Sequence, residues 1–155
     1  MFGILKDDNW LMAETRIDNL PILIRVRQAL PAEQDRRPFT DLMIITWPYE
    51  ITDSGMPSAQ TYEQMLRFEK AIEQGIEANG IGVQAASLTG NGHKEWRYFS
   101  KNGEEFLSQL NISLDGHPVY PIAIESFLDE EWTAHSELLP QAHGTPPDQV
   151  PDSIA

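Results

Sequence analysis

Apolar residues recur along this chain with the two-residue period of strands and with the three-to-four-residue period of helices. Residues 42–47 (LMIITW) form an uninterrupted apolar run, which is typical of a strand covered on both faces. Residues 81–86 alternate, as a half-covered strand does. Between them, a helix is predicted from Ser58, whose hydroxyl can cap the first turn, to the glycine turn at 79–80. The stretch therefore predicts a strand, a long helix and a second strand.

One face of this predicted helix has the spacing of a packed surface. Its positions are Tyr62, Met65, Leu66, Glu69, Ile72 and Ile76. Five of the six are apolar, so we expect this face to pack on the sheet. Glu69 lies among them, and a carboxylate there needs a positively charged partner. The candidate partners are Arg25, Arg27 and Arg97.

The remaining pattern predicts four further strands and a second helix. The expected strands are 10–17, 20–28, 93–100 and 119–128, and the expected helix is 104–114. The order is two strands followed by β-α-β-β-α-β, which predicts an α+β fold with a ferredoxin-like antiparallel sheet and two helices on one face. The N-terminal hairpin is expected to extend that sheet. A sheet with the same elements in another order is the alternative.

Length and composition predict one domain. A chain of 155 residues can bury one core, so residues 1–139 are interpreted as a single α+β domain. A short helical piece is expected between 129 and 139. Residues 140–155 are rich in proline and acidic, and we interpret them as a disordered tail. The chain lacks a long apolar run and a signal-peptide pattern, which indicates a cytoplasmic protein without a membrane span.

Charge is the strongest functional signal. The chain has 24 acidic residues against 11 Lys and Arg, a net charge of −13, and no Lys or Arg follows Lys101. Such a surface repels phosphate backbones and would attract a basic protein, so nucleic acid is not an expected partner. Solubility alone is the simpler interpretation.

Motifs that carry chemistry are absent from the sequence. The 4 histidines lack metal-site spacing, there is no cysteine, and the glycine pairs lack the context of nucleotide-binding loops. No metal or cofactor is therefore expected. The aromatic residues at 96, 98 and 99 are interpreted as core rather than as an RNA-stacking platform.

Four short segments carry a resemblance to a known family. They are 55–58 (GMPS), 89–92 (TGNG), 96–99 (WRYF) and 129–132 (DEEW). Together they resemble the bacterial domain of unknown function 695, over about residues 9–140. Residues 84–89 depart from the Val-Gly and Thr pattern that is usual in that family. The resemblance implies no activity.

Three functional interpretations follow, in order of preference. The first is a non-enzymatic acidic module that binds a basic protein, such as a nuclease or toxin, as an inhibitor or immunity-type partner. Its expected contacts are Glu125, Asp129, Glu130, Glu131 and Trp132, although Trp132 is also expected to dock the last helical piece. The second is a structural domain that forms a homodimer through its sheet.

The third interpretation is a small-ligand or enzyme pocket where Arg25, Glu69 and Arg97 converge. Glu69 would then act as a general acid or base with a perturbed pKa. An ordinary ion pair at the margin of the sheet is preferred for Glu69, because no other catalytic residue clusters with it.

Overall fold

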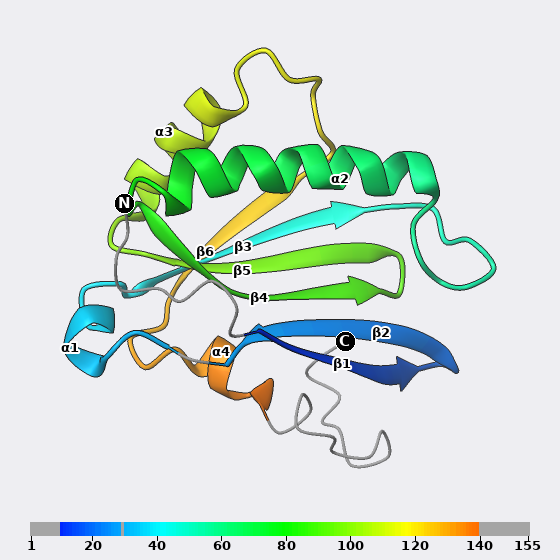
Figure 1. Ribbon diagram of the computed structural model, residues 1–155, viewed down its shortest axis with the longest axis horizontal. Coiled ribbons are helices and arrows are strands. Elements are labelled where there is room, and N and C mark those ends of the chain that lie inside the picture. The colour runs from blue at the N-terminus through cyan, green and yellow to red at the C-terminus, as the bar shows by residue number, and fades with distance from the viewer. Residues whose placement is uncertain (1–9, 29, 140–155) are drawn as a thin grey trace.

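All six strands of the structure belong to one antiparallel sheet (Figure 1). In this computed structural model, which describes residues 10–28 and 30–139, the strand order is β1-β2-β4-β5-β3-β6. The strands are β1 (Trp10–Ile17), β2 (Leu20–Arg27), β3 (Asp41–Pro48), β4 (Gly82–Gly90), β5 (His93–Ser100) and β6 (Ala123–Leu128). The predicted α+β class is confirmed.

Helical segments connect and cover these strands. They are α1 (Glu33–Arg36), α2 (Ala59–Ile72), the π-helical turn η1 (Glu73–Glu77), α3 (Gly103–Ser113) and α4 (Thr133–Ser136). The side chain of Ser58 accepts a hydrogen bond from the Thr61 N–H at 3.2 Å, so the predicted cap of α2 is confirmed. Within the described residues, no helix is long and apolar enough to cross a membrane.

The N-terminal hairpin extends the sheet, as expected, but the strand order and the last strand differ from the expected pattern. β2 pairs with β4, so the hairpin of β1 and β2 continues the sheet past β4 and the whole strand order differs from a four-stranded ferredoxin-like sheet. β6 begins at Ala123 rather than at Val119, since Pro121 precedes it and cannot donate to a ladder. The predicted tail, residues 140–155, lies outside the described residues.

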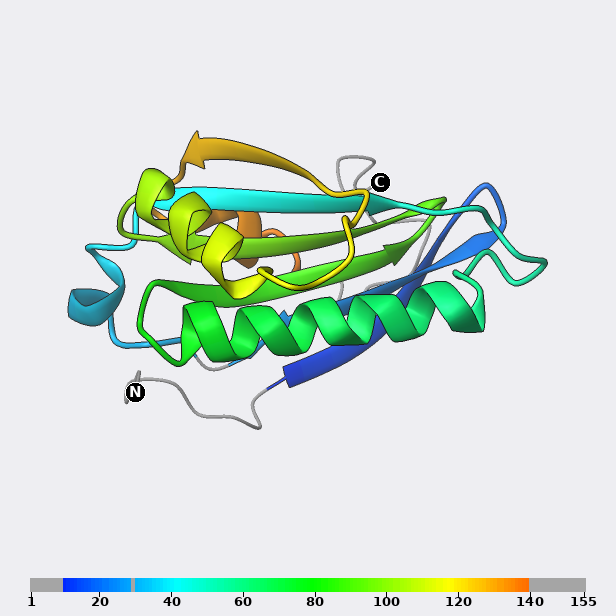
Figure 2. The ribbon, with the colours of Figure 1, turned by 90° about the horizontal axis from the view of Figure 1, so that it is seen from above.

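The main core lies between the sheet and the layer of α2, η1 and α3 (Figure 2). Trp96 and Tyr98 point into it from β5 and are at most 1% exposed. The Phe68 ring of α2 lies 5.0 Å from the Trp96 ring and 5.8 Å from that of Trp47. Such tilted and edge-on pairs add to the free energy of apolar burial. The interpretation of these aromatic residues as core is confirmed.

The opposite face of the sheet is covered in part by α4 and the turn before it. Trp132 stacks on Phe99 with ring centroids 4.1 Å apart and planes 4° from parallel, and its Nε1 donates to the Phe39 carbonyl at 2.8 Å. Trp132 is 2% exposed, so the prediction that it contacts a partner is wrong. Its docking role is the one that the structure supports.

A bulge in β4 changes which side chains face α2. The ladder with β5 shifts between Gln84 and Ala86, so Ala85 is an extra residue in β4. Ala85 and Ala86 therefore both pack in the clusters of the α4 face. The simple alternation predicted through residue 86 is wrong, and the bulge leaves Gln84 and Ser87 on the same side as α2.

Replacing Trp132 by alanine tests its docking role. The change removes a stacked, hydrogen-bonded ring from a buried site, so we expect the free energy of unfolding to fall by about 3–5 kcal/mol in urea titrations. The neighbouring Glu131→Ala, at an exposed position, should change it by less than about 0.5 kcal/mol. If both variants lowered the free energy of unfolding by less than about 0.5 kcal/mol, the docking role of Trp132 would be contradicted.

The buried His135 makes stability depend on pH. Its Nε2 lies 2.6 Å from the Arg27 carbonyl and therefore donates, while its Nδ1 is buried and finds no partner in the described structure. Burial lowers the pKa of His135 below its ordinary value, and the charges of Arg36 and Arg27 act in the same direction; the hydrogen bond to Arg27 opposes them. Since the unfolded chain binds this proton first, stability is fully present above about pH 6.5 and falls as the pH drops.

His135→Gln keeps a donor for the Arg27 carbonyl and cannot titrate. We expect the stability of the unmodified protein, relative to this variant, to fall between pH 7.5 and 5.5 by at most about 1.4 kcal/mol per pH unit. Denaturant unfolding of both proteins across that range measures the difference. A constant difference would show that His135 does not cause the dependence.

Candidate functional site

A groove of about 1000 Å³ runs between α2 and the hairpin of β1 and β2. The helices α2 and α3 lie over the middle and the β6 side of the sheet, whereas β1 and β2 extend past α2 (Figures 1 and 2). The groove is lined on one side by α2 and η1, on the other by β1 and β2, and at its floor by β4. Its volume is at the upper end of the range of small-molecule sites.

The polar floor of the groove is built around Arg27, which is 4% exposed. Its Nε donates to the Gln84 carbonyl at 2.9 Å, and its Nη2 donates to Glu77 Oε2 at 3.1 Å. The Gln84 N–H donates to the same Glu77 oxygen at 3.1 Å. Burial raises the pKa of Glu77, while the Gln84 hydrogen bond and the charge of Arg27 act in the opposite direction. The ion pair of Arg27 and Glu77, with the hydrogen bonds of both side chains to the Gln84 backbone, thus connects β2, η1 and β4.

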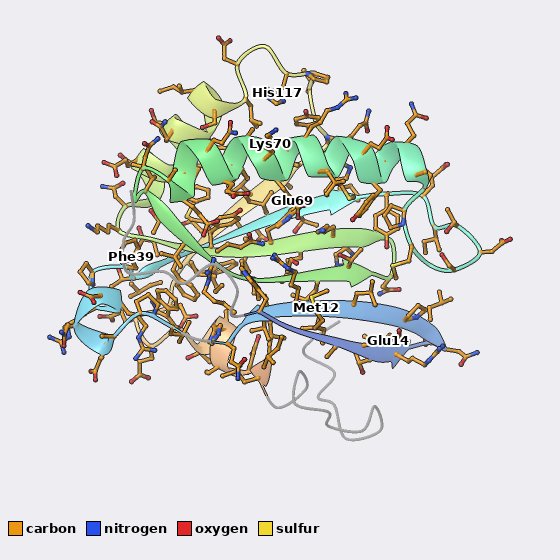
Figure 3. All side chains as sticks on the ribbon, viewed as in Figure 1. Met12, Glu14, Phe39, Glu69, Lys70 and His117 are labelled. Atoms are coloured by element: carbon orange, nitrogen blue, oxygen red, sulfur yellow. The ribbon has the colours of Figure 1, made fainter. Side chains whose placement is uncertain are left out.

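Glu69 projects from α2 into the same groove, opposite Met12 of β1 (Figure 3). Its Oε2 accepts from Trp96 Nε1 at 2.8 Å and lies 3.2 Å from Lys94 Nζ. The predicted arginine partner is therefore wrong, because Lys94 and Trp96 of the neighbouring β5 fill that role. Lys94 therefore neutralises the negative charge of Glu69, which lines the α2 side of the groove.

Arg25 also lines the groove, and its environment differs from that of the other cations. Its Cζ lies 3.8 Å from the centroid of the Trp10 ring, a cation–π contact. Among the described residues, no carboxylate lies within ion-pairing distance of Arg25. By contrast, Arg27 and Lys94 each have a glutamate partner. Arg25 is thus a half-buried cation that is open to an anionic group.

Arg97 does not belong to this site. On β5 it points to the face opposite Trp96, because neighbouring strand residues face opposite ways. There its Nε donates to Glu95 at 2.7 Å, and its Nη1 donates to Glu137 at 2.7 Å and to the Ala134 carbonyl at 2.6 Å. The prediction of a pocket joining Arg25, Glu69 and Arg97 is wrong for Arg97, while the other two residues do share one groove.

Large apolar side chains line the open part of the groove. They are Met12 at 66% exposed, Leu23 at 40%, Tyr62 at 50% and Leu66 at 45%. Tyr62 and Leu66 were predicted to pack on the sheet, but the core takes Met65 and Phe68 of α2 instead. The sequence did carry a signal for the hairpin side of the groove. Leu23, Arg25 and Arg27 occupy every second position of β2 and so share one face of the strand.

The predicted acidic contact residues lie away from the groove. Glu125 on β6, together with Glu130 and Glu131 after it, is exposed. Asp129 has a local role, because its carboxylate accepts from the Thr133 and Ala134 N–H groups at 2.9 Å and so caps α4. Within the described residues, no group of three or more His, Asp or Glu is arranged to hold a metal ion.

Comparison with known proteins gives a family assignment. The model of a family described as a family of unknown function (DUF695) matches residues 8–139. No curated protein matches the chain. The match covers the whole sheet and every helix described above, and the chain belongs to the DUF695 family.

Proposed function

We propose that this protein is a binding module that holds an apolar organic acid in the groove between α2 and the β1–β2 hairpin. The observation that carries the proposal is Arg25, a half-buried cation with no carboxylate within ion-pairing distance among the described residues, although its charge also helps to lower the pKa of Glu77. A hydrogen bond to an ionised group contributes about 1.5–3 kcal/mol, so a ligand carboxylate on Arg25 supplies both affinity and orientation.

The charge balance of the groove supports an anionic head group on the hairpin side. Glu69 and Glu77 are neutralised by Lys94 and Arg27, at 3.2 and 3.1 Å. Glu73 of η1 is exposed and also lines the groove. A ligand carboxylate would be repelled by Glu73 and attracted by Arg25, so the charges favour one orientation of the ligand.

The apolar residues support a hydrocarbon or aromatic body on the ligand. Met12 and Leu23 on one side and Leu66 on the other are between 40% and 66% exposed. Covering them contributes about 25 cal/mol per Å² of apolar surface removed from water. An exposed apolar surface gathered around one concave site is typical of a binding site.

The floor offers one further polar contact. The side-chain amide nitrogen of Gln84 is buried and lacks an acceptor in the described structure, although Gln84 lines the groove. An unsatisfied buried donor costs about 1–3 kcal/mol, which a ligand oxygen would relieve after a small rearrangement. We also interpret β3 to β6 with α2 and α3 as a ferredoxin-like unit, a proposal supported by the strand order β4-β5-β3-β6.

Binding of octanoate, octanol and octylammonium, measured by calorimetry, tests this function. The three probes each contain eight carbon atoms and differ in the charge of the head group. We expect octanoate to bind about tenfold more tightly than octanol, because only octanoate carries a negative charge that forms an ion pair with Arg25. Octylammonium should bind more weakly than octanol.

Two matched variants locate the site. Arg25→Met keeps an apolar side chain and should weaken octanoate binding about tenfold while leaving octanol binding unchanged. Arg16→Met makes the same charge change at an exposed position of β1, where Arg16 pairs with Glu14, and should alter neither affinity. Leu66→Ser should weaken both ligands. Octanoate binding that survives Arg25→Met unchanged would contradict the proposal.

A further inference from the structure

The outer side of β6 is an open edge of the described sheet, at the end opposite to the β1–β2 hairpin. β6 is the last strand of the sheet and pairs with β3 on its inner side; within the described residues no strand pairs with its outer side (Figure 2). Such an edge presents unpaired backbone N–H and C=O groups, which can accept an additional strand. Phe127 and Leu128 on this strand are 46% and 71% exposed.

We propose that β6 binds an extended, basic segment of another protein as a seventh strand of the sheet. This proposal does not depend on the groove. The backbone edge would supply hydrogen bonds, and Phe127 and Leu128 would pack against apolar side chains of the added strand. The charged residues around the edge determine which sign of charge the bound segment should carry.

Those charges are acidic. Glu125 is exposed on β6, Glu130 and Glu131 are exposed just after it, and no Lys or Arg follows Lys101 in the chain. Arg97 of β5 lies on the same face of the sheet as Glu125, with β3 between the two strands. Its charge is already neutralised by Glu95 and Glu137, each at 2.7 Å. A segment carrying lysine or arginine is therefore favoured by electrostatic complementarity.

The same charges disfavour a second copy of this chain as the occupant. Two β6 strands paired edge to edge around a twofold axis would bring the two sets of Glu125, Glu130 and Glu131 into one interface. Like charges brought together across an interface oppose association. The acidic residues thus protect the edge against self-association and leave it open to a basic strand.

The test uses two fluorescent nine-residue peptides, one alternating lysine with valine and one alternating glutamate with valine. Anisotropy measures their affinity for the full chain. We expect the basic peptide to bind, with a dissociation constant that rises at least about tenfold between 50 and 300 mM NaCl. The acidic peptide should not bind. Failure of the basic peptide to bind would overturn the proposal.

Charge-matched variants separate a specific edge from general attraction to an acidic protein. E125K/E130K/E131K should weaken binding of the basic peptide at least tenfold. E50K/D53K/E63K changes the net charge equally at exposed positions on the loop before α2 and on α2, and should weaken it less than threefold. Equal weakening in both variants would overturn the proposal. E125Q/E130Q/E131Q, a milder change, should give an intermediate loss.

Hydrogen exchange shows whether the peptide adds as a strand. The peptide should slow exchange of amides within residues 123–128 and leave those of β1 unchanged. Binding without protection of β6 would overturn the added-strand proposal. If the mass of the protein doubles and β6 is protected without peptide, a second copy occupies the edge and the proposal is likewise overturned.

Discussion

The width of the sheet relative to its helices is the constraint on which the rest of the structure depends. A helix is about 10 Å wide and neighbouring strands lie about 4.8 Å apart, so two helices side by side cover roughly four strands. This sheet has six strands, and α2 and α3 are the long helices on one face of its described part. Within residues 10–28 and 30–139, one face of the β1–β2 hairpin is therefore left beside α2 without a covering helix, and a groove is formed there.

The groove keeps its shape because buried charges are paired across its floor. Arg27 of β2 is held by Glu77 of η1 and by the Gln84 carbonyl of β4 at 3.1 and 2.9 Å. Removal of either charge would leave the other buried and uncompensated, at a cost of several kcal/mol. The π-helical turn and the β-bulge, two irregular features, bring Glu77 and Gln84 to this point. Local irregularity thus determines where the polar floor lies.

The sequence predicted the strands and helices well, because their signals are local. The apolar run of β3, the Ser58 cap and the alternation of β5 each depend on a few neighbouring residues. Two errors arose from long-range packing. Tyr62 and Leu66 have helical spacing but border a groove whose existence depends on sheet width. The β4 bulge has no clear sequence signal, and it moved Ala86 to the other face.

The candidate site was predicted only in part, for the same reason. Arg25 and Glu69 share the groove, but Arg97 points to the other face, as the alternation of β5 already indicated. Lys94 replaced arginine as the partner of Glu69, which sequence spacing could not reveal. Trp132 was expected both to dock the last helical piece and to contact a partner; docking is the role observed, and its stacking partner Phe99, distant in the chain, could not be named from the sequence.

The central claim is that the ligand lies between α2 and the hairpin with its acid group at Arg25. Mapping of amide chemical shifts during titration with octanoate tests it most directly. The account predicts that the largest changes fall in β1, β2, η1 and the groove side of α2, with the Arg25 side-chain Nε–H among them. Changes confined to α4 and β6, or spread evenly over the sheet, would contradict it.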